Sequence, residues 1–199
     1  MTWRDCPADH DALPAYAAPV GTPTLVVVSG PAGSGKSTLA RALGRAVPCP
    51  VVSRDEIKEG MVAATPGHVP AAGDALTLAT YQLFFETIVL LLRGGVTVVA
   101  EAGFQHRLWA PGLEPLAGIA ELKVVRCVVP AEVARRRGLE RMSTDPARAA
   151  HADAEWFAVP RTFEPLDLDV ATLDVRTADG WDPALEEVAA FCRPGWSPR

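Results

Sequence analysis

Residues 30–37 read Gly-Pro-Ala-Gly-Ser-Gly-Lys-Ser and carry the strongest chemical pattern in the chain. They match G-x-x-x-x-G-K-[ST], in which glycines let successive backbone N–H groups turn inward toward a phosphate. The pattern predicts that Lys36 bridges the β- and γ-phosphates of a nucleotide, that Ser37 holds Mg²⁺ and that Thr38 contacts the α-phosphate. The predicted nucleotide-binding residues are Gly33, Ser34, Gly35, Lys36, Ser37 and Thr38.

Asp55 follows a short apolar run at residues 50–53 and is the first candidate for a catalytic group. Next to a phosphate-binding loop, a carboxylate there could orient an acceptor hydroxyl and take its proton. The alternative is that Asp55 only caps the helix that follows. Lys58 lies three residues later, on the same helix face. It could bind an anionic group of the substrate or pair with Asp55, and the sequence leaves both open.

Glu101 directly follows the apolar run at residues 96–100, in an arrangement that resembles a Walker B element. The carboxylate of such an element holds Mg²⁺ directly or through water. Because aspartate is commoner there, a role for Glu101 as a base or in substrate binding stays open beside the metal role. The remaining alternative is an ordinary solvated carboxylate after a strand.

A group of arginines follows the apolar run at residues 122–129. It predicts a mobile lid over the site at about residues 138–155. An arginine that closes over the γ-phosphoryl group stabilises its developing charge, and a closing lid also excludes water. Arg137 and Arg141 are four residues apart, share a helix face and are the favoured catalytic pair. The polar segment 143–151 is expected to be mobile. The full group is Arg135, Arg136, Arg137, Arg141 and Arg148.

Apolar runs and helical patterns alternate along the chain, and this order predicts how these residues are positioned. It is typical of an α/β fold with a five-stranded, mostly parallel sheet and helices on both faces. Ligands of such sheets bind at the carboxyl ends of the strands, where the candidate residues fall. The predicted strands are 24–29, 50–53, 96–100, 122–129 and 171–177, and the predicted helices are 37–47, 54–63, 74–93, 108–117, 131–141 and 183–192.

The composition limits the classes of protein that the chain can belong to. With 199 residues, of which 49% are hydrophobic and 22% charged, it is not a largely disordered chain. Its net charge of −5 argues against a sequence-independent nucleic-acid binder. Its four cysteines lack zinc spacing. The longest apolar run, 88–92, is too short to span a bilayer, and we expect a cytoplasmic protein without a membrane partner.

One domain is expected, with two short appendages. Residues 1–22 predict an irregular N-terminal arm, residues 23–193 the domain with its lid, and residues 194–199 a C-terminal tail. The sequence does not predict an oligomeric state.

These residues together resemble the small P-loop kinases of the adenylate-kinase-like group. The resemblance is greatest to the ATP-binding kinase family that takes in chloramphenicol phosphotransferase and the kinase domain of phage polynucleotide kinase. It implies a P-loop NTPase fold with ATP and Mg²⁺ as cofactors. By the same resemblance Asp55 activates the acceptor, Lys36 binds phosphate, and Arg137 or Arg141 acts from the lid. Lys58 falls where polynucleotide kinases carry an arginine that binds a substrate phosphate.

The hypothesis that follows is an ATP- and Mg²⁺-dependent kinase acting on a hydroxyl of a small molecule, such as an antibiotic or another natural product. One alternative keeps the kinase but makes the acceptor a polynucleotide 5′-hydroxyl or a nucleotide, and the acidic net charge counts against the polymer. The other is a regulatory NTPase switch that hydrolyses ATP slowly and has no acceptor. The guanine-binding signature Asn-Lys-x-Asp is absent from the sequence, which favours adenine as the base.

Overall fold

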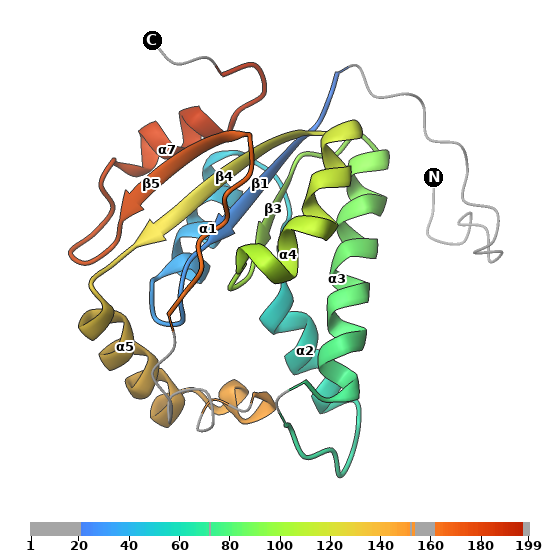
Figure 1. The fold of residues 1–199 in the computed structure, drawn as a ribbon, viewed down its shortest axis with the longest axis vertical. Coiled ribbons are helices and arrows are strands. Elements are labelled where there is room, and N and C mark those ends of the chain that lie inside the picture. The colour runs from blue at the N-terminus through green and yellow to red at the C-terminus, as the bar shows by residue number, and fades with distance from the viewer. Residues whose placement is uncertain (1–20, 72, 152, 154–161, 197–199) are drawn as a thin grey trace, which may run out of the picture.

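The computed structural model describes residues 21–71, 73–151, 153 and 162–196 (Figure 1). Most of the expected N-terminal arm, part of the expected lid and the end of the expected tail therefore lie outside the described residues. The strands are β1 Thr24–Ser29, β2 Val51–Ser53, β3 Val98–Glu101, β4 Glu121–Val128 and β5 Ala171–Arg176. The α-helices are α1 Lys36–Ala46, α2 Arg54–Ala63, α3 Ala75–Arg93, α4 His106–Leu113, α5 Ala131–Thr144 and α7 Leu185–Cys192, and the 3₁₀ helices are η2 Glu114–Gly118 and η3 Pro146–Ala150.

The five strands form one sheet in the order β2-β3-β1-β4-β5, and every neighbouring pair is parallel. This confirms the predicted five-stranded α/β fold. The central strand β1 is buried along its whole length, as its unbroken β-branched and apolar sequence predicts for a strand covered on both faces.

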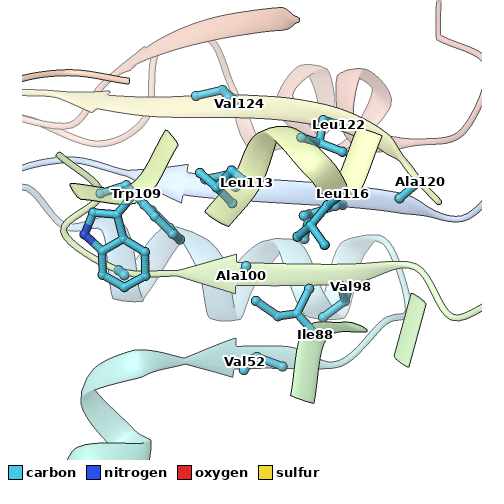
Figure 2. Packing of buried hydrophobic residues seen from close by; sticks show 14 of the residues in the cluster. Val52, Ile88, Val98, Ala100, Trp109, Leu113, Leu116, Ala120, Leu122 and Val124 are labelled. Atoms are coloured by element: carbon cyan, nitrogen blue, oxygen red, sulfur yellow. The ribbon is translucent and has the colours of Figure 1, made fainter. Parts of the chain in front are cut away.

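Two hydrophobic clusters separate the faces of the sheet because successive strand side chains point to opposite sides. Leu25 and Val27 pack with α3 and α4 on one face, whereas Val26 and Val28 pack with α1 and α7 on the other. Figure 2 shows the first cluster, in which Ile88 of α3 lies against the strands. Helices therefore cover both faces, as the sequence predicts.

The strand register places the polar ends of three strands side by side. Glu101, the last residue of β3, is level with Ser53 of β2 on one side and with Val28 of β1 on the other. The loop that follows β1 and the helix that follows β2 therefore begin next to the Glu101 carboxylate. The helices α2 and α5 and the 3₁₀ helix η3 lie beyond this end of the sheet (Figure 1).

Helix α3 is long and apolar enough, by length and composition alone, to cross a membrane. In this fold one face of α3 packs into the first hydrophobic cluster through Phe84, Ile88 and Leu92. Its start is fixed by Asp74, whose carboxylate accepts a hydrogen bond from the Thr77 amide at 2.6 Å. The predicted N-cap is therefore confirmed.

The segment 143–151, predicted as a mobile polar stretch, contains a short helix. Asp145 accepts a hydrogen bond from the Ala147 amide at 3.0 Å and starts the 3₁₀ helix η3. Arg148 and Ala150 of this helix are buried. The segment makes contacts with α2 that its polar composition does not reveal, and its mobility stays a prediction.

Candidate active site

The loop after β1 has the backbone shape that its glycines predict. Gly33 and Gly35 have φ angles of +80° and +81°, in the left-handed region that favours glycine. A Cβ atom on Gly33 would lie 2.0 Å from the carbonyl oxygen of Ala134, so α5 packs directly against the loop. The Thr177 hydroxyl, just beyond β5, donates to the Ser34 carbonyl oxygen at 2.7 Å and holds the loop from the other side.

The loop leads into α1 in a way that suits a phosphate group. Lys36 is the first residue of α1, and the first hydrogen bond along the helix runs from the Leu39 amide to the Gly35 carbonyl at 3.0 Å. The amides of residues 35–38 precede that bond, so the helix leaves them without intrahelical acceptors. Free amides at a helix N-terminus beside a lysine form a site for an anion, and these residues fit a nucleotide triphosphate.

Glu101 joins the loop to the strand β2. Its carboxylate accepts hydrogen bonds from the Ser37 hydroxyl at 3.1 Å and from the Ser53 hydroxyl at 2.8 Å, and its Oε1 lies 3.8 Å from Lys36 Nζ. The residue is 2% exposed, so the alternative of a solvated carboxylate is wrong. Ser37 and Glu101 offer neighbouring oxygen ligands to a magnesium ion, which in such sites also keeps waters and phosphate oxygens. The predicted metal role fits this donor set and stays a prediction.

Asp55 lies in the first turn of α2 and does not cap it. The cap is Ser53, whose hydroxyl accepts a hydrogen bond from the Glu56 amide. The alternative in which Asp55 serves only as the N-cap is therefore wrong. Its carboxylate instead forms two ion pairs, with Arg54 Nη1 at 3.2 Å and with Arg148 Nη1 at 3.0 Å.

The electrostatic surroundings of Asp55 favour its ionised form. Burial alone would raise the pKa of the Asp55 carboxyl, but neighbouring positive groups lower that pKa well below its ordinary value. The groups that lower it are, in descending order, His151, Lys36, Arg54 and Arg148. Lys36, the loop lysine, therefore lies close enough to Asp55 to act on its charge.

Lys58 does not form the pair with Asp55 that the sequence left open. Its ammonium group is buried, donates to the Thr77 hydroxyl at 2.7 Å and lies 3.7 Å from Asp74 Oδ2. It ties α2 to the start of α3, and no direct pair with Asp55 forms, so that alternative is wrong. Burial lowers the pKa of Lys58, an effect that the charge of Asp74 opposes. A substrate-binding role for Lys58 stays a prediction, and it would require the ammonium group to leave these partners.

The favoured lid arginines differ from each other in their surroundings. Arg137 donates to the carbonyl oxygens of Thr177 at 2.9 Å and Ala178 at 2.5 Å, and so fixes the turn after β5. Arg141 is half-buried, and its guanidinium group forms no hydrogen bond or ion pair among the residues that the structure describes. Neither contacts Asp55 here, and their catalytic role stays a prediction.

Arg148 belongs to the predicted lid group, but the sequence did not predict its burial or its contact with Asp55. It is 8% exposed and donates to both carboxylate oxygens of Asp153, at 2.7 Å each, as well as to Asp55. The available signal was the acidic residue five positions later, which can hold an arginine in place. The contact with Asp55, 93 positions away, has no sequence signal at all.

The fold and this site define a P-loop kinase architecture of the adenylate-kinase-like group. Residues 25–166, most of the chain, match the family AAA_33, described as an AAA domain, and the chain belongs to this P-loop kinase family. Comparison with curated proteins gave no match.

Solved structures of kinases share the fold. A candidate kinase from Chloroflexus aurantiacus is 23% identical with a TM-score of 0.75, over 89% of this chain and 100% of that one. A sugar kinase from Janibacter sp. is 20% identical with a TM-score of 0.59, over 86% and 94% of the two chains. The APS kinase CysC of Mycobacterium tuberculosis, in complex with AMPPNP and APS, is 19% identical with a TM-score of 0.57, over 84% and 94%. At these identities the likeness establishes the fold.

Proposed function

We propose that the protein is an ATP- and Mg²⁺-dependent kinase that transfers the γ-phosphoryl group of ATP to a hydroxyl group of a small molecule, such as an antibiotic or another natural product. The observation that carries the proposal is the position of the Asp55 carboxylate in the first turn of α2, two residues after Ser53, which shares Glu101 with Lys36. A base and a phosphate-binding lysine at the same end of the sheet are the two groups that phosphoryl transfer to an alcohol requires.

Each residue then has a defined task. Lys36 and the amides of residues 35–38 hold the phosphates, and Asp55 orients the acceptor O–H group. As the alcohol oxygen bonds to the γ-phosphorus, the bond from that phosphorus to the bridging oxygen breaks, ADP leaves, and the alcohol proton passes to Asp55. Because the transition state is loose, positioning contributes more than the basicity of the carboxylate. Ser37 and Glu101 would hold Mg²⁺, which would neutralise part of the phosphate charge.

The charges on the acceptor side favour a neutral acceptor. Lys58 is paired with Asp74, Arg148 with Asp153, and Arg54 with Asp55. An anionic acceptor would have to displace a carboxylate to reach any of these three cations. Together with the net charge of −5, this supports a small hydroxylated molecule over a nucleic acid.

The deciding experiment incubates the protein with labelled ATP and Mg²⁺ and offers either a panel of hydroxylated small molecules or 5′-hydroxyl oligonucleotides. We expect label on a small molecule. Asp55→Ala should lower transfer by about 10²–10⁴-fold while ATP binding persists. Lys36→Ala should lose both transfer and ATP binding.

Glu86→Ala, an exposed carboxylate on α3, is the matched control and should transfer phosphate like the wild type. Normal transfer by Asp55→Ala would overturn the role of Asp55 as the base. Label on oligonucleotides alone would replace the small-molecule acceptor, and release of phosphate with no acceptor labelled would identify a regulatory NTPase.

A further inference from the structure

Three carboxylates share the guanidinium group of Arg148. Nη1 donates to Asp55 Oδ2 at 3.0 Å, Nε and Nη2 donate to the two oxygens of Asp153, and Glu59 Oε1 lies 3.8 Å from Nη1. His151 Nε2 lies 3.0 Å from the same Glu59 oxygen. These contacts join η3 to α2, and we call Arg148, Asp55, Asp153, Glu59 and His151 the Arg148 cluster.

The Arg148 cluster leaves Asp55 poorly able to accept a proton. Oδ1 is paired with Arg54 and Oδ2 with Arg148, so each carboxylate oxygen faces a guanidinium group. An acceptor hydroxyl needs one of these oxygens at hydrogen-bond distance. Arg54 is the neighbour of Asp55 in the same helix, whereas Arg148 belongs to η3, a separate element. The Arg148 guanidinium group can therefore leave Asp55 without any change in the backbone of α2.

A phosphate bound to Lys36 is the group that can take Arg148 away from Asp55. Glu101 lies 3.8 Å from Lys36 Nζ and accepts a hydrogen bond from Ser53, two residues before Asp55. A γ-phosphate bound to Lys36 would therefore come near Asp55 and the Arg148 guanidinium paired with it. A guanidinium group binds phosphate oxygens through paired, charge-assisted hydrogen bonds, so the phosphate competes directly with the Asp55 carboxylate. Asp153 would keep the other edge of the guanidinium group oriented during this exchange.

We infer that Arg148 masks Asp55 until a nucleotide binds, and that transfer of the guanidinium group from Asp55 to the γ-phosphoryl group opens the acceptor site; this rests on the proposed function. The exchange forms and breaks only hydrogen bonds and ion pairs. It frees Asp55 Oδ2 for the acceptor hydroxyl and brings positive charge to the phosphoryl group that will react. The consequence is ordered binding, with the nucleotide before the acceptor.

The test follows the Nε–H signal of Arg148 by ¹⁵N NMR in the full chain, assigned by its loss in Arg148→Lys. Without nucleotide, Asp55→Asn should shift this signal because the ion pair is broken. With Mg²⁺ and the non-hydrolysable analogue AMPPNP, Asp55→Asn should no longer shift it. Asp169→Asn, an exposed carboxylate outside the Arg148 cluster, should shift it in neither state.

An equal shift with and without AMPPNP would overturn the masking role. A crystal structure of the wild type with Mg²⁺ and AMPPNP gives the same decision without any variant: we expect Nη1 of Arg148 beyond hydrogen-bond distance of Asp55, and a retained pair refutes the inference. If AMPPNP leaves the amide signals of residues 33–38 unchanged, nucleotide binding itself fails. That result overturns the proposed function together with the inference that rests on it. Bound AMPPNP with a retained pair between Arg148 and Asp55 overturns the inference alone.

Discussion

The single carboxylate of Glu101 connects β3 to both α1 and β2. Its Oε1 accepts from Ser37 at the start of α1, and its Oε2 accepts from Ser53 at the end of β2. Aspartate, one methylene shorter, would reach less far from the end of β3. The longer side chain thus has a structural reason here, because it spans the gap between the two hydroxyl groups while it neutralises Lys36.

Removal of this carboxylate should destabilise the whole protein. We expect Glu101→Ala to lower the free energy of unfolding by about 3 kcal/mol, because it leaves Lys36 as a buried charge without its partner and Ser53 without its acceptor. Urea denaturation followed by circular dichroism measures the change. Glu86→Ala on the exposed side of α3 should stay within about 0.5 kcal/mol of the wild type. Equal stability of the two variants would contradict the role given to Glu101.

Asp74 provides a pH-dependent contribution to stability. Burial would raise the pKa of its carboxyl, but hydrogen bonds from the Ala71 and Thr77 amides and the charge of Lys58 lower it below the ordinary value. A pKa that is lower in the folded state than in the unfolded state, where it is about 3.9, means that folding is favoured while the group is ionised. The contribution is therefore present at neutral pH and is lost as the pH falls through the folded pKa.

Asp74→Asn isolates this charge because asparagine also caps helices well. We expect the variant to be about 2 kcal/mol less stable than the wild type at pH 7. The difference should start to shrink as the pH falls below about 4, where the carboxyl takes up a proton in the unfolded state, and should disappear as the pH falls through the lower folded pKa. Urea titrations at a series of pH values measure it, and a difference that stays constant with pH would show that the charge of Asp74 contributes nothing.

At the scale of elements, α5 is fitted to the phosphate-binding loop. Gly33→Ala would place a Cβ atom 2.0 Å from the Ala134 carbonyl oxygen at a φ of +80°, so α5 would have to move away. We expect a loss of about 1–3 kcal/mol in the free energy of unfolding and loss of ATP binding. Thermal unfolding and ATP titration measure these two effects.

Gly60 in α2 gives the opposite case in the same protein. It lies in a helix, and a Cβ atom there meets nothing within 4 Å. Gly60→Ala should raise the free energy of unfolding by about 0.5–1 kcal/mol, because alanine loses less conformational freedom on folding. If Gly33→Ala behaved like Gly60→Ala, the tight packing of α5 against the loop would be refuted.

At the scale of the molecule, a feature can be predicted from the sequence when the residues that determine it are neighbours along the chain. The strands, the glycine loop and the Asp74 cap depend on neighbouring residues, and all three are predicted from the sequence. The partners of Lys58 and Arg148 depend on where separate helices pack, so a charge and its periodicity could not identify them. Asp55 shows both cases. Its place after β2 can be predicted from the sequence, whereas the choice of Ser53 as the N-cap depends on the exact start of α2.

Nucleotide binding should stabilise the whole fold because its site draws on the ends of several elements. At a concentration about 100 times its Kd, Mg²⁺·ATP should add about 2.7 kcal/mol, which for a domain of this size raises Tm by about 5–10 °C. Differential scanning calorimetry measures the shift, and Lys36→Ala should abolish it.

GTP should give a smaller shift, since the sequence lacks the guanine-binding signature and Arg137 fixes the turn at Thr177 and Ala178 that would flank the base. Equal shifts with ATP and GTP would mean that the protein recognises the triphosphate alone.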